Sequence, residues 1–445
     1  MYFVPIYILI LFLTISIDYF TGILIEKSGG RKKKWFLVSS IVINISLLSF
    51  FKYFNFFIEN LNSISVSLGS TSSYNYLSII LPIGLSFHTF QAMSYTIEVY
   101  RGNQKAERHF GIYSLYVMFY PQLVAGPIER PQNMLSQFHE KHQFRFENFF
   151  SGLRWMLWGL FKKVVVADRL AIMVDNIYNG SGQASGIEWI GATILFAIQI
   201  YCDFSGYSDM ALGSARIMGF DLMLNFKQPY FSKNISEFWL RWHISLSTWF
   251  KDYLYIPLGG NRVNLRRWCF NIFFVFLISG LWHGANWTFI IWGALHAVFL
   301  IVSELRKKYI NPLIKFDLNF DFLNVLLTFL LVSFAWIFFR ANSIDQALHI
   351  CKVIFNVYDP YYFQIYKSNL YGLPGTIFGL SNWKFFMSLT VIPFLFYSDY
   401  LISSKKMNVL INSKPMYSWS IYYILILLIL LFGVFDTNQF IYFQF

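Results

Sequence analysis

The sequence has few charged residues and very little cysteine. Charged side chains make up 13% of its 445 residues, whereas soluble domains carry about 25%. Hydrophobic residues make up 56% and recur in long runs from end to end. One membrane-embedded domain, residues 1–445, is therefore favoured over the roughly three soluble domains that length alone suggests. The cysteines are widely spaced and odd in number, which predicts apolar packing rather than a disulfide framework: Cys202, Cys269 and Cys351.

Several motifs of other protein classes are also missing. The sequence contains no phosphate-binding glycine loop, zinc motif or serine nucleophile elbow, so we expect no metal and no permanently bound cofactor. It shows no internal repeat of the kind that marks inverted-repeat transporters. The N-terminus has neither a basic region nor a small-residue cleavage site, so we expect residues 2–25 to be retained as a first transmembrane helix.

Positive charge is in excess, with 35 Lys and Arg against 23 Asp and Glu and a net charge of +12. Much of it lies in short loops between apolar runs, within residues 27–34 and 306–308. This distribution follows the positive-inside rule and places those loops on the cytoplasmic side of a membrane. Because no separate basic domain is present, we expect the partner to be the lipid bilayer and not a nucleic acid.

Ten apolar stretches predict an all-α polytopic membrane protein with about nine to eleven spans, one stretch being long enough for a hairpin. The stretches are residues 2–25, 35–58, 76–98, 112–130, 150–174, 187–219, 268–304, 321–340, 384–403 and 417–436. Proline and glycine interrupt the third and fourth, which predicts broken or re-entrant backbone that is buried in protein or lines a cavity. Residues 221–267 are amphipathic and predict a segment in the interface or in a funnel, and residues 359–383 predict an extramembrane loop.

His283 is the first candidate for chemistry. It lies in the run Leu281-Trp282-His283-Gly284-Ala285-Asn286-Trp287, between two apolar segments. An ionisable side chain at that depth is expensive, and a buried neutral imidazole has the property that a general base requires. Small neighbours leave room for a substrate, and Asn286 is suited to orient the ring or to donate to an oxyanion. A histidine bonded to a backbone carbonyl explains the same residues equally well, so the residues alone leave both interpretations open.

The amphipathic segment supplies a second histidine, His243. Arg241 and Lys251 are suited to phosphates of a substrate, and Asp252 is suited to pair with either base. An interfacial helix with snorkelling cations explains these residues more simply. Two carboxylates, Asp203 and Asp209, lie in a further apolar run and need buried partners, for which Arg216 and Arg241 are candidates. They predict either a polar tunnel lining or a structural ion pair, the latter being favoured for Asp209.

Several long motifs together resemble the bacterial membrane-bound O-acyltransferases of the alginate O-acetylation type. The motifs are Leu81 to Gln91, Tyr120 to Pro127, Tyr201 to Met210, Phe238 to Gly260, Trp282 to Asn286 and the terminal Phe440 to Phe445. The resemblance covers nearly the whole chain. It departs from the family pattern at the start, because family members usually carry one or two further hydrophobic spans before the segment that resembles residues 2–25.

The resemblance implies a ring of transmembrane helices around a central tunnel, with His283 as the catalytic histidine and His243 as the second motif histidine. It implies transfer of an acyl group from a cytoplasmic thioester donor, thought to be acetyl-CoA, toward an exported polysaccharide. It further implies an extracytoplasmic SGNH-type partner and a location in the bacterial cytoplasmic (inner) membrane. Other motif residues are expected to support the site or line the tunnel: Trp282, Asn286, Asp203, Asp209, Arg241, Trp242, Ser245, Lys251, Asp252, Gln122 and Pro127.

Rival functions remain open at this point. Within the same family, a D-alanyl or lipid acyltransferase fits the same motifs. A transporter would need repeat symmetry and paired midplane charges, which the sequence lacks. A non-catalytic scaffold for a secreted transferase would be distinguished by whether activity survives loss of His283. The sequence does not name the acceptor, and alginate, cellulose, peptidoglycan and capsular glycans all fit.

Overall fold

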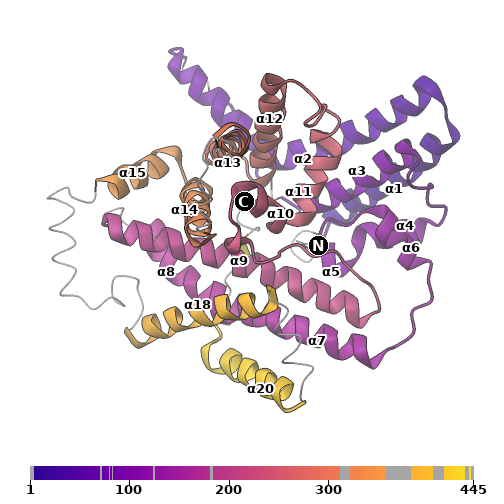
Figure 1. The fold of residues 1–445 in the computed structure, drawn as a ribbon. Coiled ribbons are helices and arrows are strands. Elements are labelled where there is room, and N and C mark those ends of the chain that lie inside the picture. The colour runs from indigo at the N-terminus through magenta and orange to yellow at the C-terminus, as the bar shows by residue number, and fades with distance from the viewer. Residues whose placement is uncertain are drawn as a thin grey trace. The chain divides into compact units, whose positions relative to one another are not determined.

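The computed structural model describes residues 5–70, 73–79, 81–82, 84–123, 126–180, 184–310, 321–356, 382–403, 415–435 and 440–441. Every regular element in these ranges is a helix, as predicted (Figure 1). The chain divides into two compact units. Unit 1 is Met1–Phe149 with Ser214–Met223, and unit 2 is Phe150–Gly213 with Leu224–Phe445. The assignment of the whole chain to one domain stays a prediction.

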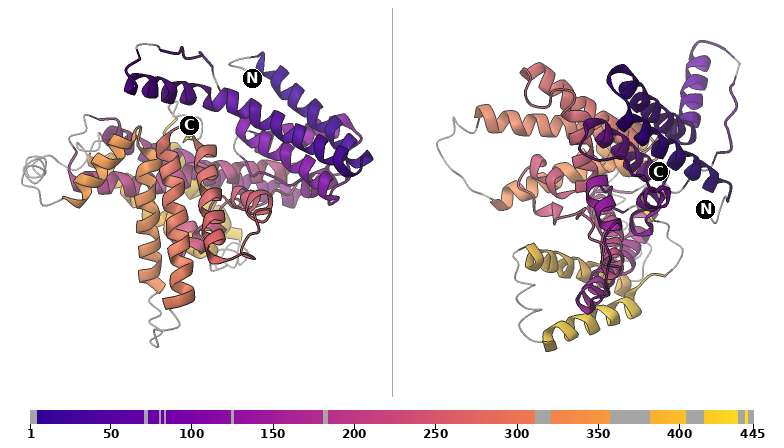
Figure 2. Two further views of the ribbon diagram at one scale, coloured as in Figure 1. Left: turned by 90° about the horizontal axis from the view of Figure 1, so that it is seen from above. Right: turned by 90° about the vertical axis from the view of Figure 1, so that its right-hand side faces the viewer.

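Six helices of the described residues are long and apolar enough to cross a membrane. They are α1 (Tyr7–Lys27), α2 (Gly30–Ser67), α9 (Gly186–Ile217), α12 (Leu265–His283), α13 with its π-helical extension (Trp287–Tyr309) and α14 (Asp321–Arg340). All six were predicted as spans, and α12 and α13 confirm the predicted hairpin. These two helices pack side by side in every view (Figures 1 and 2). The protein is therefore a multi-pass membrane protein.

In unit 1, the proline and glycine positions end or start helices instead of kinking them. The predicted span 76–98 is wrong in its first part, because α3 begins only at Leu85, after Gly84 in the left-handed conformation with φ 79°. The stretch 112–130 is broken, as predicted. It is divided among α4 (Phe110–Met118), α5 (Tyr120–Leu123) and the non-helical residues 126–130, which lead to α6 (Pro131–Phe138).

A buried carboxylate fixes the first three helices of unit 1. Asp18 of α1 is fully buried and accepts hydrogen bonds from Ser40 Oγ at 2.6 Å and from Asn44 Nδ2 at 2.9 Å, both on α2. Ser40 Oγ also lies 3.1 Å from Thr96 Oγ1 on α3. Since hydrocarbon offers no hydrogen bonds, these polar side chains are satisfied only when the three helices pack in this register.

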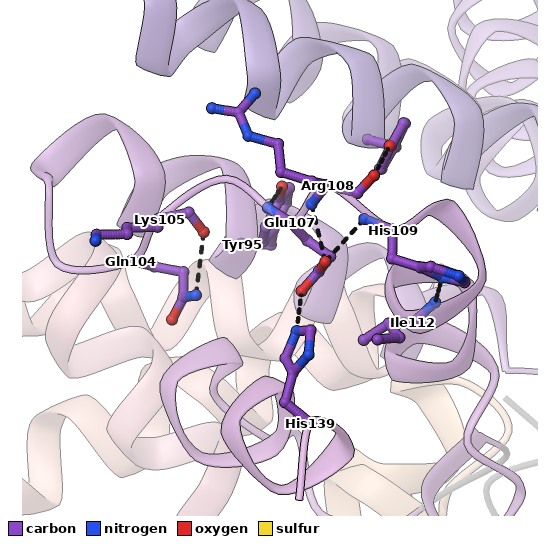
Figure 3. A network of polar contacts seen from close by, with 9 residues as sticks. Tyr95, Gln104, Lys105, Glu107, Arg108, His109, Ile112 and His139 are labelled. Atoms are coloured by element: carbon purple, nitrogen blue, oxygen red, sulfur yellow. Dashed lines mark hydrogen bonds and ion pairs between the residues drawn. The ribbon is translucent and has the colours of Figure 1, made fainter.

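A second network holds the loop between α3 and α4, outside the apolar spans (Figure 3). The Glu107 carboxylate accepts from the backbone N–H groups of Arg108 and His109, each at 2.8 Å, and lies 2.7 Å from His139 Nε2. The Glu107 backbone N–H donates to Tyr95 Oη at 2.9 Å. Burial raises the pKa of the Glu107 carboxyl, but the hydrogen bonds from His109, His139 and Arg108 outweigh it, and the net pKa lies below its usual value.

This depressed pKa predicts a loss of stability in acid. Because the folded state lowers the pKa of Glu107, its contribution is complete above the unfolded pKa of about 4.3 and is lost as the pH falls through the folded value. The thermal midpoint should therefore fall between pH 6 and pH 3, and Glu107→Gln should make that fall shallower. Exposed Glu140→Gln is the control. An identical pH profile for Glu107→Gln and the wild type would contradict the assignment.

One uninterrupted helical run, which belongs to unit 2 from Phe150 onward, consists of three elements, where the sequence predicted the single span 150–174. It comprises α7 (Phe146–Leu160), the π-helix η1 (Phe161–Ala167) and α8 (Asp168–Tyr178). The run packs closely on α9, and a Cβ at Gly159 would lie 2.4 Å from the Gly206 carbonyl oxygen. Two glycines therefore allow η1 to approach the part of α9 that carries the carboxylates.

The amphipathic segment 221–267 folds into short pieces, in agreement with its predicted character. The pieces are the 3-10 helix η2 (Pro229–Phe231), α10 (Ile235–Arg241), α11 (Ile244–Phe250) and the π-helix η3 (Lys251–Tyr255). The remaining helices are η4 (Arg306–Ile310), α15 (Ile344–Phe355), α18 (Asn382–Ser403) and α20 (Pro415–Phe432). The predicted loop 359–383 lies outside the described residues, apart from its last two, which belong to α18.

Buried ion pairs join η1 to α9. Lys162 Nζ lies 2.5 Å from Asp209, and Lys163 Nζ lies 2.6 Å from Asp203 and 2.7 Å from Asp168. The expectation that arginines pair with Asp203 and Asp209 is therefore wrong. The π-helical turn holds more residues than an α turn and presents two consecutive lysines toward one neighbouring helix.

Removal of one charged partner from the buried ion pairs should lower the stability of the protein strongly. Lys163→Met leaves two buried carboxylates without their cation, which costs about 3–5 kcal/mol, so we expect a large fall in the thermal unfolding midpoint in detergent. Lys233→Met is the matched control, because Lys233 and Asp321 form an ion pair that is 50% and 59% exposed, and such pairs contribute about 0–1 kcal/mol. Equal effects of the two substitutions would show that the Lys163 pairs do not stabilise the fold.

Candidate active site

His283 is the last residue of α12 and is 3% exposed. The chain leaves the helix at Gly284, turns, and starts α13 at Trp287. A Cβ at Gly284 would lie 2.1 Å from Phe289 Cε2, so this glycine makes room for the Phe289 ring and not for a substrate as expected. Asn286 caps α13, because its side-chain oxygen accepts from the Thr288 N–H at 3.0 Å.

The Asn286 amide is used at its other end as well, where Nδ2 donates to the Asn342 carbonyl at 3.2 Å. Its side chain thus holds the turn that follows His283. Its predicted role toward the substrate stays a prediction.

Aromatic rings surround His283 edge to face. The ring centroids of Trp282, Trp292 and Phe339 lie 5.0, 4.9 and 5.4 Å from the imidazole, at interplanar angles of 79°, 86° and 72°. These rings exclude water, and electrostatic interactions are stronger in such surroundings. A buried neutral imidazole among apolar rings is suited to take up a proton from a substrate hydroxyl.

His243 lies at the junction of α10 and α11 in the left-handed conformation, with φ 41° and ψ 55°. A residue with a side chain adopts this conformation at a cost of order 1 kcal/mol, and such residues concentrate at functional sites. The ring is fully buried, 4.6 Å from Phe204 and 6.1 Å from Trp282. The strained backbone therefore turns the imidazole into the interior.

The side chain of Asn225 fixes the His243 ring. Its Oδ1 lies 3.2 Å from His243 Nδ1 and also accepts from the Ser245 N–H at 3.2 Å and Ser245 Oγ at 2.9 Å. The Asn225 carbonyl oxygen accepts from the Ile244 N–H at 2.9 Å. Because an amide oxygen only accepts, Nδ1 of His243 carries the proton, and the Nε2 atom carries the lone pair.

The two predicted histidines are thus brought to one aromatic ring. His243 and His283 both contact Trp282, and Trp242 of the same cluster packs 5.1 Å from Trp336. Ser245 joins the cluster through Asn225. These residues come from the loop before η2, the α10–α11 junction with the start of α11, the end of α12, and α14, so four separate stretches of unit 2 build the site.

Other predicted residues have partners of their own or belong to unit 1. Arg241 pairs with Glu237 one turn earlier on α10, and Lys251 and Asp252 begin η3, where the Lys251 side chain is exposed. Asp203 and Asp209 pair with the η1 lysines, which supports the structural interpretation of these carboxylates. Gln122 and Pro127 are buried in unit 1, where Gln122 Nε2 donates to the Tyr116 carbonyl at 3.0 Å.

Two further side chains were missed from the sequence. Asn225 carried no signal, since a lone asparagine before a turn is ordinary. His296 was not singled out, because its sequence surroundings do not resemble those of His283, yet it is fully buried beside Trp292. Among the described residues, no group of three or more His, Cys, Asp or Glu is placed to hold a metal ion.

Comparison with known proteins identifies the family of the chain. The model of the MBOAT, membrane-bound O-acyltransferase, family matches residues 109–339. The chain belongs to this family. It is 39% identical to a probable alginate O-acetylase of Pseudomonas putida over 80% of this chain and 72% of the relative, and 39% identical to a peptidoglycan O-acetyltransferase of Helicobacter pylori over 76% and 68%. It is 29% identical to a teichoic acid D-alanyltransferase of Streptococcus thermophilus over 54% and 60%.

Both site histidines lie inside the matched region, as do Asn225 and the aromatic rings around them. As a member of the membrane-bound O-acyltransferase family, the protein is an acyltransferase. The resemblance stated from its motifs is therefore confirmed at the level of family and enzyme class.

The Asn225 contact gives a testable prediction. Asn225→Leu keeps the volume but leaves the His243 and Ser245 donors buried without their acceptor, which costs about 1–3 kcal/mol of stability. If His243 acts in the reaction, turnover per folded molecule should also fall about tenfold or more, while Asn225→Asp, which keeps the acceptor oxygen, should retain more activity. The control is Asn271→Leu, which replaces another buried asparagine, one whose amide donates to the Leu258 and Gly260 carbonyls. Equal turnover per folded molecule in both leucine variants would deny His243 a role.

Proposed function

We propose that the protein is an O-acetyltransferase that moves an acetyl group from a thioester donor to an exported polysaccharide. The observation that carries this is the buried His283, enclosed by aromatic rings and sharing Trp282 with the strained His243. Two relatives are named for alginate and peptidoglycan O-acetylation. From these names we take acetyl as the proposed acyl group and a polysaccharide as the proposed acceptor.

The chemistry follows from a neutral imidazole. His283 takes the proton from an acceptor hydroxyl as its oxygen attacks the carbonyl carbon of the thioester. The carbon–sulfur bond then breaks, and the departing thiolate takes the proton from the imidazolium. A thioester is already activated, so this scheme needs no covalent enzyme intermediate, and one positioned base contributes about 10²–10⁴-fold.

The proposed donor is acetyl-CoA from the cytoplasm. Lys251 is exposed and is the better candidate for its phosphates, since Arg241 is already paired with Glu237. The proposed route is a tunnel ringed by about nine to eleven spans, of which six are described helices. The acyl group would leave the bacterial inner membrane on an extracytoplasmic SGNH-type partner, which completes transfer to the glycan.

A D-alanyl transferase is the second candidate, favoured by the teichoic acid D-alanyltransferase among the relatives. The sequence identity and coverage of that relative are lower than those of the acetylating relatives, so the acetyl donor is preferred. Purified protein offered labelled acetyl-CoA or a D-alanyl thioester separates the two by which acyl group is consumed.

Loss of His283 tests the catalytic proposal. His283→Ala should reduce consumption of acetyl-CoA by about 10²–10⁴-fold, the contribution of one general base, with a thermal midpoint close to that of the wild type. His349→Ala, on the exposed side of α15, should change neither. A non-catalytic scaffold for a secreted transferase would keep full glycan acetylation in cells after His283→Ala, and that result would refute the proposal.

A further inference from the structure

His296 is buried without any hydrogen-bonding partner among the described residues. It lies on α13, its side chain has no exposed surface, and neither Nδ1 nor Nε2 makes a hydrogen bond. An unsatisfied buried polar group destabilises the folded protein, and a phenylalanine of similar shape would avoid that destabilisation. Buried polar atoms that lack partners therefore need an explanation, such as a bound group that satisfies them.

Two indole groups beside His296 share this property. The ring centroids of Trp239 and Trp292 lie 4.9 and 5.0 Å from the imidazole. The Nε1 atoms of both indoles are buried, and neither makes a hydrogen bond within the described part of the chain. Four unsatisfied nitrogen atoms thus lie on three rings in mutual contact, contributed by α10 and α13.

The cluster of His296, Trp239 and Trp292 also contacts His283, the proposed catalytic base. Trp292 contacts the His296 ring at 5.0 Å and the His283 ring at 4.9 Å. A group that binds at His296 would therefore be separated from the reacting atoms by about the size of one indole. This distance suits a neighbouring part of a substrate and not the bond that reacts.

We propose that His296, Trp239 and Trp292 form a buried hydrogen-bonding subsite for one uncharged polar group of a substrate, an amide or a hydroxyl. The two indoles supply N–H donors, and a neutral imidazole supplies one donor and one acceptor. An amide or a hydroxyl offers an oxygen that accepts and a hydrogen that is donated, whereas a carboxylate or phosphate only accepts and would leave the imidazole acceptor unused. The inference rests on the proposed transferase function, in which either the thioester donor or the acceptor provides this group.

The test uses His296→Phe in the full-length protein, reconstituted in lipid nanodiscs. The variant keeps an aromatic ring and removes both nitrogens, so its unliganded thermal midpoint should equal or exceed that of the wild type. We expect kcat/KM for acetyl-CoA consumption to fall about tenfold or more, consistent with loss of one or two hydrogen bonds. An increase in KM would assign the subsite to the donor's amides, and a lower kcat at unchanged KM to the acceptor's hydroxyl. His296→Gln, which keeps a donor and an acceptor, should recover most of the loss.

A binding measurement separates this inference from the proposed function. Pantetheine, an uncharged molecule with both amides and hydroxyls, should raise the thermal midpoint of the wild type and not that of His296→Phe. If the wild type consumes no acetyl-CoA but shows this shift, the subsite stands and the proposed function fails. His349→Phe on the exposed side of α15 is the control. The subsite is refuted if His296→Phe leaves both KM and kcat unchanged. Equal shifts in both proteins, or no shift in either, exclude the donor as the ligand of the subsite, and the inference then stands only if His296→Phe lowers kcat at unchanged KM.

Discussion

The contact between η1 and α9 is the interaction on which unit 2 depends. Two lysines and the carboxylates opposite them cannot be satisfied by lipid, so the helices are held together by the need to pair these charges. Asp203 extends the contact, because its Oδ2 also accepts from the Ile441 N–H at 2.7 Å. Phe440 packs against Phe204, and Phe204 packs against His243. The pairing of Asp203 is therefore connected to Phe440 and Ile441 and to one wall of the histidine site.

The site combines a strained element with a rigid support. His243 is held in a conformation that residues with side chains rarely adopt, and such a conformation persists only where the surroundings determine it. Asn225 fixes this conformation, because its side-chain oxygen and its backbone carbonyl accept hydrogen bonds from residues 243–245. A histidine held in one tautomer and one orientation needs little reorganisation when a substrate arrives, which is the requirement for efficient general-base catalysis.

The sequence predicted what depends on long-range pattern. The α12–α13 hairpin follows from apolar length, and His283 was singled out because it lies between two apolar segments. His243 lies in an amphipathic segment, and only the resemblance to the acyltransferase family indicated it. The sequence did not predict the Lys162 and Lys163 pairs, because a π-helical turn has no distinct sequence signature and the sequence does not show which neighbouring helix these two lysines of the predicted span 150–174 face. Gly284 was taken as space for a substrate because the sequence does not show that Phe289 packs on it. Asn225 was missed because its role depends on tertiary contact alone.

The high aromatic content has a chemical consequence beyond anchoring the protein in a membrane. Edge-to-face rings close around His283 and His296 and keep both water and lipid away from them. Such rings offer hardly any hydrogen-bonding atoms, so a polar side chain buried among them has lost its hydrogen bonds to water without replacement. A polar ligand that enters the shell restores such hydrogen bonds. An aromatic shell of this kind is most stable when the groups that it encloses are apolar. When the enclosed groups are polar, hydrogen bonds from a substrate to them contribute binding free energy. Imidazoles inside the shell therefore lower the stability of the unliganded protein and raise its affinity for a molecule that hydrogen-bonds to them.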